Sequence, residues 1–201
     1  MAPEYWVIAQ ETHHEIRIER SRFIGHATLT ASEEEAKAFI GAIRRQYADA
    51  THNCYAYRVG LGTAAITYYH DHGEPTGTAG KPILNAILQA NLFHTTVVVT
   101  RYFGGKKLGV RGLIDAYHQT AAETLAKAGR SPWVEGCAWE LTLPYANWQN
   151  IQNLISRHKG KVLNCSYAEN VHCRVWLPSD SQLPVTEALS QMEQVVFKPE
   201  R

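Results

Sequence analysis

The sequence predicts a mixed α+β protein of two domains. Three observations carry this prediction. Strand and helix patterns alternate through the first two thirds of the chain, Ser131-Pro132 interrupts them, and the remainder has the order strand, helix, strand, strand, helix, strand. We therefore expect an N-terminal domain over residues 1–131 and a C-terminal domain over residues 137–201.

The N-terminal domain opens with two strand patterns followed by a helix. Glu15–Ile18 and Ser21–Ala27 alternate polar and apolar residues or carry β-formers, which predicts a pair of strands. Ser32 and Glu35 form a capping box ahead of an apolar spacing that continues to Tyr47. The capping box and the spacing together predict an amphipathic helix.

Three strands and two helices complete this domain. Asn53–Val59 and Ile66–His70 are predicted to pair with each other across a glycine-containing turn. Ile83–Ala90 has the pattern of a short buried helix. Thr95–Phe103 is rich in β-branched residues, which is typical of a central strand, and Gly112–Ala128 is predicted to be a helix.

The C-terminal domain is predicted to have the β-α-β-β-α-β order of a ferredoxin-like fold. Glycine and asparagine at the expected breaks separate its elements. In chain order the predicted elements are Trp139–Pro144, Asn147–His158, Lys161–Tyr167, His172–Leu177, Pro184–Met192 and Val195–Lys198.

Composition limits the classes of protein to consider. The net charge of +1 argues against a generally basic nucleic-acid coat, so any electrostatic preference must be local. No apolar run approaches the roughly 20 residues that span a bilayer, and Met1–Gln10 lacks the features of a signal peptide. We expect a cytoplasmic protein without a membrane partner. Its four cysteines, which contain no C-x-x-C pair, are expected to be reduced and mostly buried: Cys54, Cys137, Cys165 and Cys173.

A first glycine-rich loop runs from His70 to Pro82. It enters a predicted helix, whose first N–H groups favour an anion, and Lys81 adds a cation there. It is not a Walker A loop, because Pro82 follows the lysine where serine or threonine is required. The alternative is a tight connection with Thr78 as the N-cap. The glycines that permit positive φ or close approach are Gly73, Gly77 and Gly80.

The same loop carries two acids. Asp71 and Glu74 are candidates for an acid–base pair or for Mg²⁺ ligands facing a phosphate. We favour a structural interpretation in which Asp71 is a turn residue and Glu74 pairs with a loop cation. A zinc site is also conceivable, but the standard ligand spacings are absent, so we predict neither metal nor cofactor. The residues such a site would use are His52, Cys54, His70 and His72.

A second glycine-rich loop, from Arg101 to Gly112, contains four cations and no acid. It too runs from a strand into a helix N-terminus, an arrangement that suits the phosphate of a nucleotide or of an RNA backbone. An aromatic pair at its start offers a ring for base stacking. A solvated basic turn is the alternative. The predicted anion and nucleic-acid contacts are Arg101, Tyr102, Gly104, Gly105, Lys106, Lys107 and Arg111, with Lys81 and Arg22.

The remaining aromatic residues give no sign of a stacking platform. Ten tyrosines and five tryptophans are scattered along the chain. We expect most of them in the core or at a domain interface.

Both loops and their flanking strands resemble the IMPACT/YigZ family. The similarity covers most of residues 15–130 in order and is weaker after residue 135. It implies a first domain with the fold shared by a small-subunit ribosomal protein, elongation factor G domain four and the GHMP kinases, and a second domain similar to elongation factor G domain five. The segments that carry it are Glu19–Ile24, Asp49–Ala56, Asp71–Pro82, Val97–Gly109 and Gly112–Tyr117.

The resemblance also bears on function. Eukaryotic relatives regulate translation by competing for an activator of a stress-responsive initiation-factor kinase, and nucleic-acid or ribosome binding is the usual suggestion for bacterial members. The family usually has a second acid where this chain has His72, and a glycine where it has Arg111. His72 weakens a metal or acid–base role for the first loop, whereas Arg111 makes the second loop more basic.

We therefore expect a translation-linked binding protein rather than an enzyme. Its expected partners are RNA, the ribosome or a translation-regulatory protein, and its oligomeric state stays open. The alternative is a Mg²⁺-dependent enzyme that acts on a small phosphorylated substrate.

Overall fold

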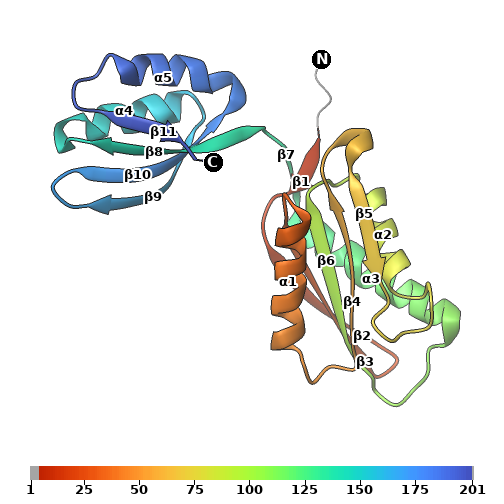
Figure 1. Cartoon of the computed structure of the whole chain (residues 1–201). Helices are drawn as coiled ribbons and strands as arrows, with labels where there is room; N and C mark the ends of the chain where they lie inside the picture. Colours follow the sequence, from red (N-terminus) through yellow and green to blue (C-terminus); the bar gives the residue numbers. More distant parts are fainter. Residues whose placement is uncertain (1–4, 201) are drawn as a thin grey trace. The chain divides into compact units, whose positions relative to one another are not determined.

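The computed structural model describes residues 5–200 and divides the chain into two units, Met1–Trp133 and Val134–Arg201 (Figure 1). Each unit combines helices with a β-sheet and has its own hydrophobic core. The predicted mixed α+β class with two domains is therefore confirmed.

A five-stranded antiparallel sheet with the order β2-β3-β6-β4-β5 is the framework of the first unit. Its central strand is the β-branched run, and it is buried along almost its whole length. The strands are β2 (Thr12–Ile18), β3 (Ser21–Leu29), β4 (His52–Val59), β5 (Ile66–His70) and β6 (Thr95–Tyr102).

Helices cover both faces of this sheet. Helix α1 (Glu33–Gln46) packs on one face, and α2 (Gly80–Gln89) and α3 (Gly109–Ala128) pack on the other (Figure 1). Successive side chains of a strand point to opposite faces, so Val98 joins the core beneath α1 while its neighbours in β6 join the core beneath α2 and α3. As predicted, the Ser32 side chain caps α1 and accepts a hydrogen bond from the backbone N–H of Glu35.

The second unit has the predicted order of elements and a four-stranded antiparallel sheet, β11-β8-β10-β9. Apolar side chains from the strands and from both helices form a core that shares no residue with the first unit. The elements are β8 (Gly136–Leu143), α4 (Tyr145–Arg157), β9 (Lys161–Tyr167), β10 (Val171–Pro178), α5 (Gln182–Ser190) and β11 (Val196–Pro199).

The sequence analysis did not predict two short strands. β1 (Trp6–Ile8) pairs with β7 (Arg130–Pro132) in a separate two-stranded sheet. The Ser131-Pro132 break is therefore a strand that belongs to the first unit, and the structure divides the chain after Trp133. Strands of three residues are too short to show an alternating pattern, which is why they were missed.

Two helices of the first unit begin earlier than the apolar pattern indicated. Helix α2 begins at Gly80 instead of Ile83, and α3 begins at Gly109 instead of Gly112. Glycine lowers the helix propensity of both first turns, so the pattern alone placed them in loops. Both glycine-rich loops therefore end directly on a helix N-terminus.

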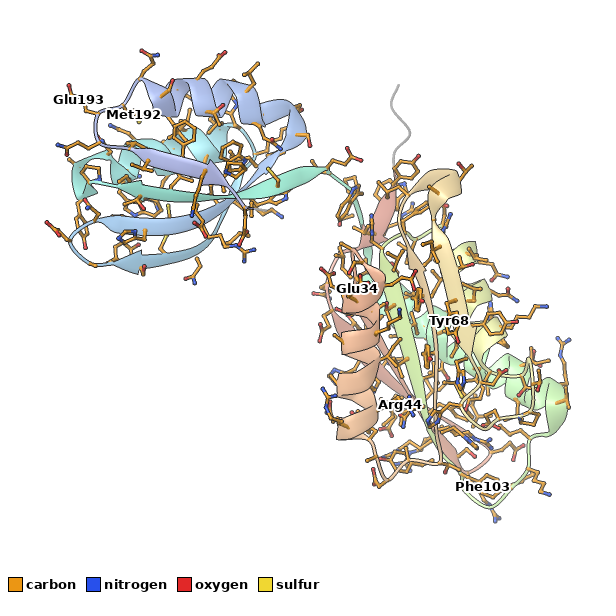
Figure 2. All side chains as sticks on the ribbon, in the orientation of Figure 1. Glu34, Arg44, Tyr68, Phe103, Met192 and Glu193 are labelled. Atoms are coloured by element: carbon orange, nitrogen blue, oxygen red, sulfur yellow. The ribbon has the colours of Figure 1, made fainter. Side chains whose placement is uncertain are left out.

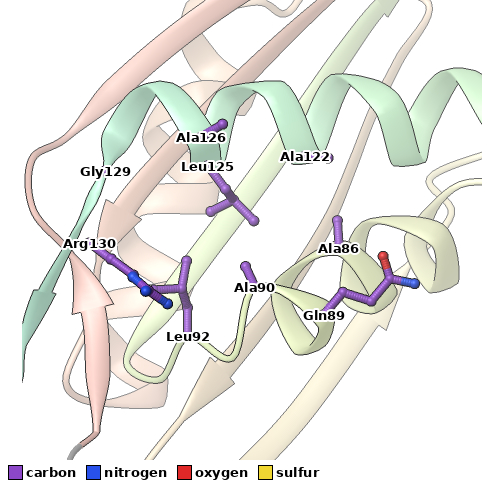
Figure 3. Close-up of a pocket in the computed structure, with 9 residues that line it drawn as sticks. All are labelled: Ala86, Gln89, Ala90, Leu92, Ala122, Leu125, Ala126, Gly129 and Arg130. Atoms are coloured by element: carbon purple, nitrogen blue, oxygen red, sulfur yellow. The ribbon is translucent and has the colours of Figure 1, made fainter.

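Small residues let α2 and α3 lie side by side, with a cavity of about 430 Å³ near their C-terminal ends (Figure 3). Ala86 and Ala122 line it, and its one charged lining residue is Arg130, whose guanidinium lies 4.7 Å from the ring centroid of Trp6. Alanine and leucine provide no reacting group, so we assign no chemistry to this cavity. No helix within residues 5–200 has both the length and the apolar character needed to cross a membrane.

Candidate functional site

Both glycine-rich loops lie at the same end of the five-stranded sheet. Strands β5 and β6 finish there, and β3 and β4 begin there, as the pairing of Arg101 with His52 and of Tyr102 with Arg22 requires. Figure 2 marks the position with Phe103, directly after β6. The fold thus brings together two segments that the sequence separates, and we call this region the loop end.

A buried ion pair joins the two loops. Glu74 and Arg101 are 9% and 4% exposed, and Arg101 Nη1 donates to Glu74 Oε1 at 2.6 Å. His52 Nε2 lies 3.8 Å from the same oxygen, and Arg101 Nη2 donates to Ser21 Oγ at 3.3 Å. Glu74 therefore has the structural partner that we favoured from the sequence, and Arg101 is enclosed by the protein.

Two further groups complete the polar centre beneath the loops. The Tyr117 hydroxyl donates to Glu74 Oε1 at 2.8 Å, and the Cys54 thiol donates to the carbonyl oxygen of Asp71 at 2.8 Å. Burial raises the pKa of both the Tyr117 hydroxyl and the Cys54 thiol, and the negative charge of Glu74 raises both pKa values further. Neither group is therefore a ready nucleophile at neutral pH.

Asp71 occupies the N-terminus of α2. Its Oδ1 accepts hydrogen bonds from the backbone N–H groups of Ala79 and Gly80 at 3.0 and 2.8 Å, and its Oδ2 accepts one from Gly77 at 2.9 Å. The Thr78 hydroxyl donates to the carbonyl oxygen of Pro75 instead of capping the helix. A carboxylate of the protein thus already satisfies the anion preference of this helix start.

The N-terminus of α3 has no such partner. No side chain within residues 5–200 caps it, and its first turn contains no acid. A cavity of about 420 Å³ lies beside it, with the Glu74–Arg101 pair among its lining residues. Lys107 and two exposed apolar side chains, Phe103 and Val110, also line the cavity. An anionic group with an attached ring could meet free N–H donors, one cation and an apolar surface here.

Most of the other predicted cations have acidic partners. Lys106 Nζ lies 2.6 Å from Glu19 Oε2, and Arg111 Nε lies 3.0 Å from Asp115 Oδ2. Both pairs are exposed. Lys107 is also exposed and has no acidic partner within residues 5–200. Of the four cations in the second loop, three therefore have acidic partners, and Lys107 is the one without such a partner in the described chain.

The remaining predicted contacts surround this centre. The Arg22 guanidinium lies 4.3 Å from the ring centroid of Tyr102, whose hydroxyl donates to Asp49 Oδ1 at 2.7 Å. This hydrogen bond raises the pKa of Tyr102. Lys81 is exposed in the first turn of α2, where Asp71 already binds the helix N–H groups.

The loop glycines serve two different purposes. Gly73, Gly77 and Gly105 have φ values of +87°, +78° and +86°, a region that other residues rarely adopt. At Gly80 a Cβ would approach the backbone of His70 to 2.7 Å, and at Gly104 it would overlap the carbonyl oxygen of Arg20. The glycines thus allow the loops to turn and to pack tightly against neighbouring backbone.

The histidines make hydrogen bonds within the protein. His52 Nδ1 lies 2.9 Å from the carbonyl oxygen of His72, and His72 Nδ1 accepts from the backbone N–H of Asn53 at 3.0 Å. Burial lowers the pKa of His72, with a further contribution from the charge of Arg44. Among the residues described, no group of three or more histidine, cysteine, aspartate or glutamate side chains is arranged to hold a metal ion.

The sequence analysis named neither Tyr117 nor Val110 as a site residue, and it named His52 only for the zinc site that it did not predict. Tyr117 lies in the middle of α3 and is fully buried, so its contact with Glu74 depends on tertiary packing. His52 directly precedes the predicted strand 53–59, and only the folded sheet pairs it with Arg101. Val110 was placed in the loop only because α3 was predicted to begin later.

Two family profiles match the chain. The profile of the Impact N-terminal domain matches residues 19–125, and a profile described as a domain of unknown function (DUF1949) matches residues 141–192. The first match contains both glycine-rich loops and all of the buried polar centre.

Individual relatives are similar over most of the chain. IMPACT family member YvyE of Bacillus subtilis is 35% identical over 96% of this chain and 88% of its own length. IMPACT family member YigZ of Escherichia coli is 36% identical over 81% of this chain and 80% of its own. The crystal structure of a hypothetical protein is 28% identical, with a TM-score of 0.67, and the match covers 100% of this chain and 99% of the other.

Proposed function

This chain belongs to the IMPACT family, and from that premise we propose that it is a translation-linked binding protein that contacts RNA, free or in the ribosome, through the loop end. One observation carries the proposal. The N-terminus of α3 has no capping side chain and lies beside Lys107, a cation without an acidic partner in residues 5–200. Uncapped N–H groups and a free cation are the donors that a backbone phosphate requires.

The roles of the other loop residues follow from their contacts. Phe103, 44% exposed, provides a ring face for a base next to the phosphate position. Arg101 and Glu74 hold the two loops together through their buried ion pair. Arg111 and Lys106 add positive charge at the rim only after they leave Asp115 and Glu19. Lys107 therefore makes the largest single contribution to binding.

The test is binding of the full chain to ribosomes and to generic RNA across a salt series. Lys107→Glu should weaken binding. It should also make the negative slope of log K against log salt shallower, by about one to two. Lys161→Glu is the matched control, because it makes the same change of charge at an exposed residue of β9 in the second unit. Association that is independent of salt, or equal for both variants, would contradict the proposal.

A protein partner would give a different result. Association with ribosomes that survives nuclease treatment and high salt would indicate a translation-regulatory protein as the ligand. The Lys107 variant would then bind as well as the wild type, because counterion release would no longer drive association.

The cavity at the loop end favours one second candidate, an enzyme acting on a small phosphorylated substrate. Glu74 is the one carboxylate that lines this cavity, and Arg101 Nε has no hydrogen-bond partner among the described residues. In this candidate Glu74 is the acid–base or Mg²⁺ group, and Asp71 remains a helix cap. A Mg²⁺- or nucleotide-dependent rise in Tm would support it, and no shift with either ligand would count against it.

A further inference from the structure

A column of four aromatic rings crosses strands β4 and β5 on the face of the sheet that carries α1. Tyr55 lies opposite His70, and Tyr57 lies opposite Tyr68. The centroids of Tyr55 and His70 are 5.5 Å apart with planes at 14°, and those of Tyr57 and Tyr68 are 5.6 Å apart at 24°. Tyr55 and Tyr68 link the two pairs at 6.3 Å. Strand register thus assembles a stacking surface from tyrosines that looked scattered in the sequence.

A groove of about 450 Å³ runs between this column and α1. Lys37 and Arg44 line its helical wall, and Figure 2 labels Arg44 on α1 and Tyr68 on β5. Lys37 pairs with Glu33 at 3.5 Å, and Glu33 also accepts a hydrogen bond from the Tyr57 hydroxyl. Within the part of the chain that the structure describes, Arg44 has no acidic partner.

Charge therefore differs between the two ends of the groove. At the Tyr57 end, Glu33 neutralises Lys37. At the Tyr55 end, Arg44 lines the groove beside Tyr55. Burial raises the pKa of Tyr55, and the charge of Arg44 opposes that rise. The charge distribution therefore favours an anion at the Arg44 end and disfavours one at the end near the acidic first turn of α1.

Strand β5 leaves its side of the aromatic column exposed to solvent. It is the edge strand of the sheet, and all five of its residues are exposed, with Tyr68 at 46%. The opposite edge, β2, carries Glu15 and Arg17, charges of the kind that protect an edge from other chains. No Lys, Arg, Asp or Glu lies in β5. Aromatic surface with one uncompensated cation is therefore available to a ligand.

We propose that this groove and the exposed end of the column beside it bind a single strand of nucleic acid. Bases stack on Tyr68, which lines the groove, and on His70 next to it, and a backbone phosphate contacts Arg44. Stacking is tolerant of sequence because every base has a π-face. A duplex is disfavoured, since its bases are already stacked inside the helix. The inference rests on the proposed RNA binding, to which it adds a second contact surface and a preference for single strands.

The test measures the affinity of the full chain for a short labelled oligouridine by fluorescence anisotropy. Tyr68→Ala should weaken binding about tenfold, and Tyr68→Phe, which keeps the ring, should bind as the wild type does. Arg44→Ala should reduce the magnitude of the slope of log K against log salt by about one, whereas Arg45→Ala should leave that slope unchanged. Arg45 is the matched control because it is an exposed neighbour on α1 outside the groove. Unchanged Tm values confirm that each variant folds.

The loop-end variant Lys107→Glu, measured alongside, separates the two proposals. Equal affinities of Tyr68→Ala and Tyr68→Phe, with weak binding by Lys107→Glu, would overturn the groove and leave RNA binding at the loop end intact. The reverse pattern would support the groove and contradict the loop end. Absence of oligouridine binding by the wild type would overturn the groove, and ribosome binding would still test the loop end separately.

Discussion

Glu74 and Arg101, which are 27 positions apart in the sequence, form a buried ion pair that joins the two glycine-rich loops. Removing two charges from water carries a large desolvation penalty, which is offset only by close geometry and further hydrogen bonds. Ser21 and Tyr117 supply such hydrogen bonds. Substitution of either residue leaves the other charge buried and unpaired, so we expect it to destabilise the fold strongly.

Glu74→Gln leaves the guanidinium buried without a counter-charge. We expect this variant to lose about 3–5 kcal/mol of unfolding free energy, measured by urea titration. The double variant Glu74→Gln/Arg101→Met should lose less than the sum of the single losses, because it removes the unpaired charge. Additive losses would show that the two side chains are not coupled.

His26 gives the first unit a pH-dependent stability. It is buried, its Nε2 has no hydrogen-bond partner among the described residues, and burial lowers its pKa from 6.5 to about 4. The unfolded chain therefore binds more protons between these values, so stability falls as pH decreases through that window, by about 3 kcal/mol in all. His26→Phe should weaken the dependence of the unfolding free energy on pH between pH 6.5 and pH 4. The same pH dependence in the variant and the wild type would contradict this assignment.

The two helices at the loop end show how similar local sequences acquire different roles. Both begin at a glycine after a glycine-rich loop, and sequence reasoning gave both an anion preference. The preference is satisfied internally at α2 because the chain turns so that Asp71 reaches its N–H groups. No acid of the described chain is placed in this way at α3. That difference depends on the path of the loop and could not be predicted from composition.

Gly104 sets the path of the second loop. A methyl group there would overlap the carbonyl oxygen of Arg20, so Gly104→Ala should lose about 1–3 kcal/mol of unfolding free energy and weaken RNA binding. Gly105→Asn is the comparison, because its Cβ would meet open space and only its φ of +86° is unfavourable. We expect it to lose no more than about 1 kcal/mol. If thermal unfolding showed that Gly105→Asn loses more unfolding free energy than Gly104→Ala, this packing argument would be contradicted.

At the scale of the whole molecule, the sequence predicted the repeating patterns and missed the contacts made over long separations. All five strands of the large sheet and the full order of the second unit were predicted because alternation and helical spacing are local. The β1–β7 pairing joins residues more than a hundred positions apart and has no local signal. The Tyr55–His70 and Tyr57–Tyr68 stacks were missed for a related reason, since they depend on the register between two strands.

The central claim is that the N-terminus of α3, with Lys107, binds a backbone phosphate. Its most direct test follows backbone amide NMR shifts of the full chain during titration with single-stranded RNA. We predict that the largest shifts at the loop end occur at Lys107, Gly109 and Val110, whose amides lie at or next to the open helix start, while Gly77 and Gly80, already bonded to Asp71, change little. Unchanged α3 amides at saturating RNA would contradict the claim.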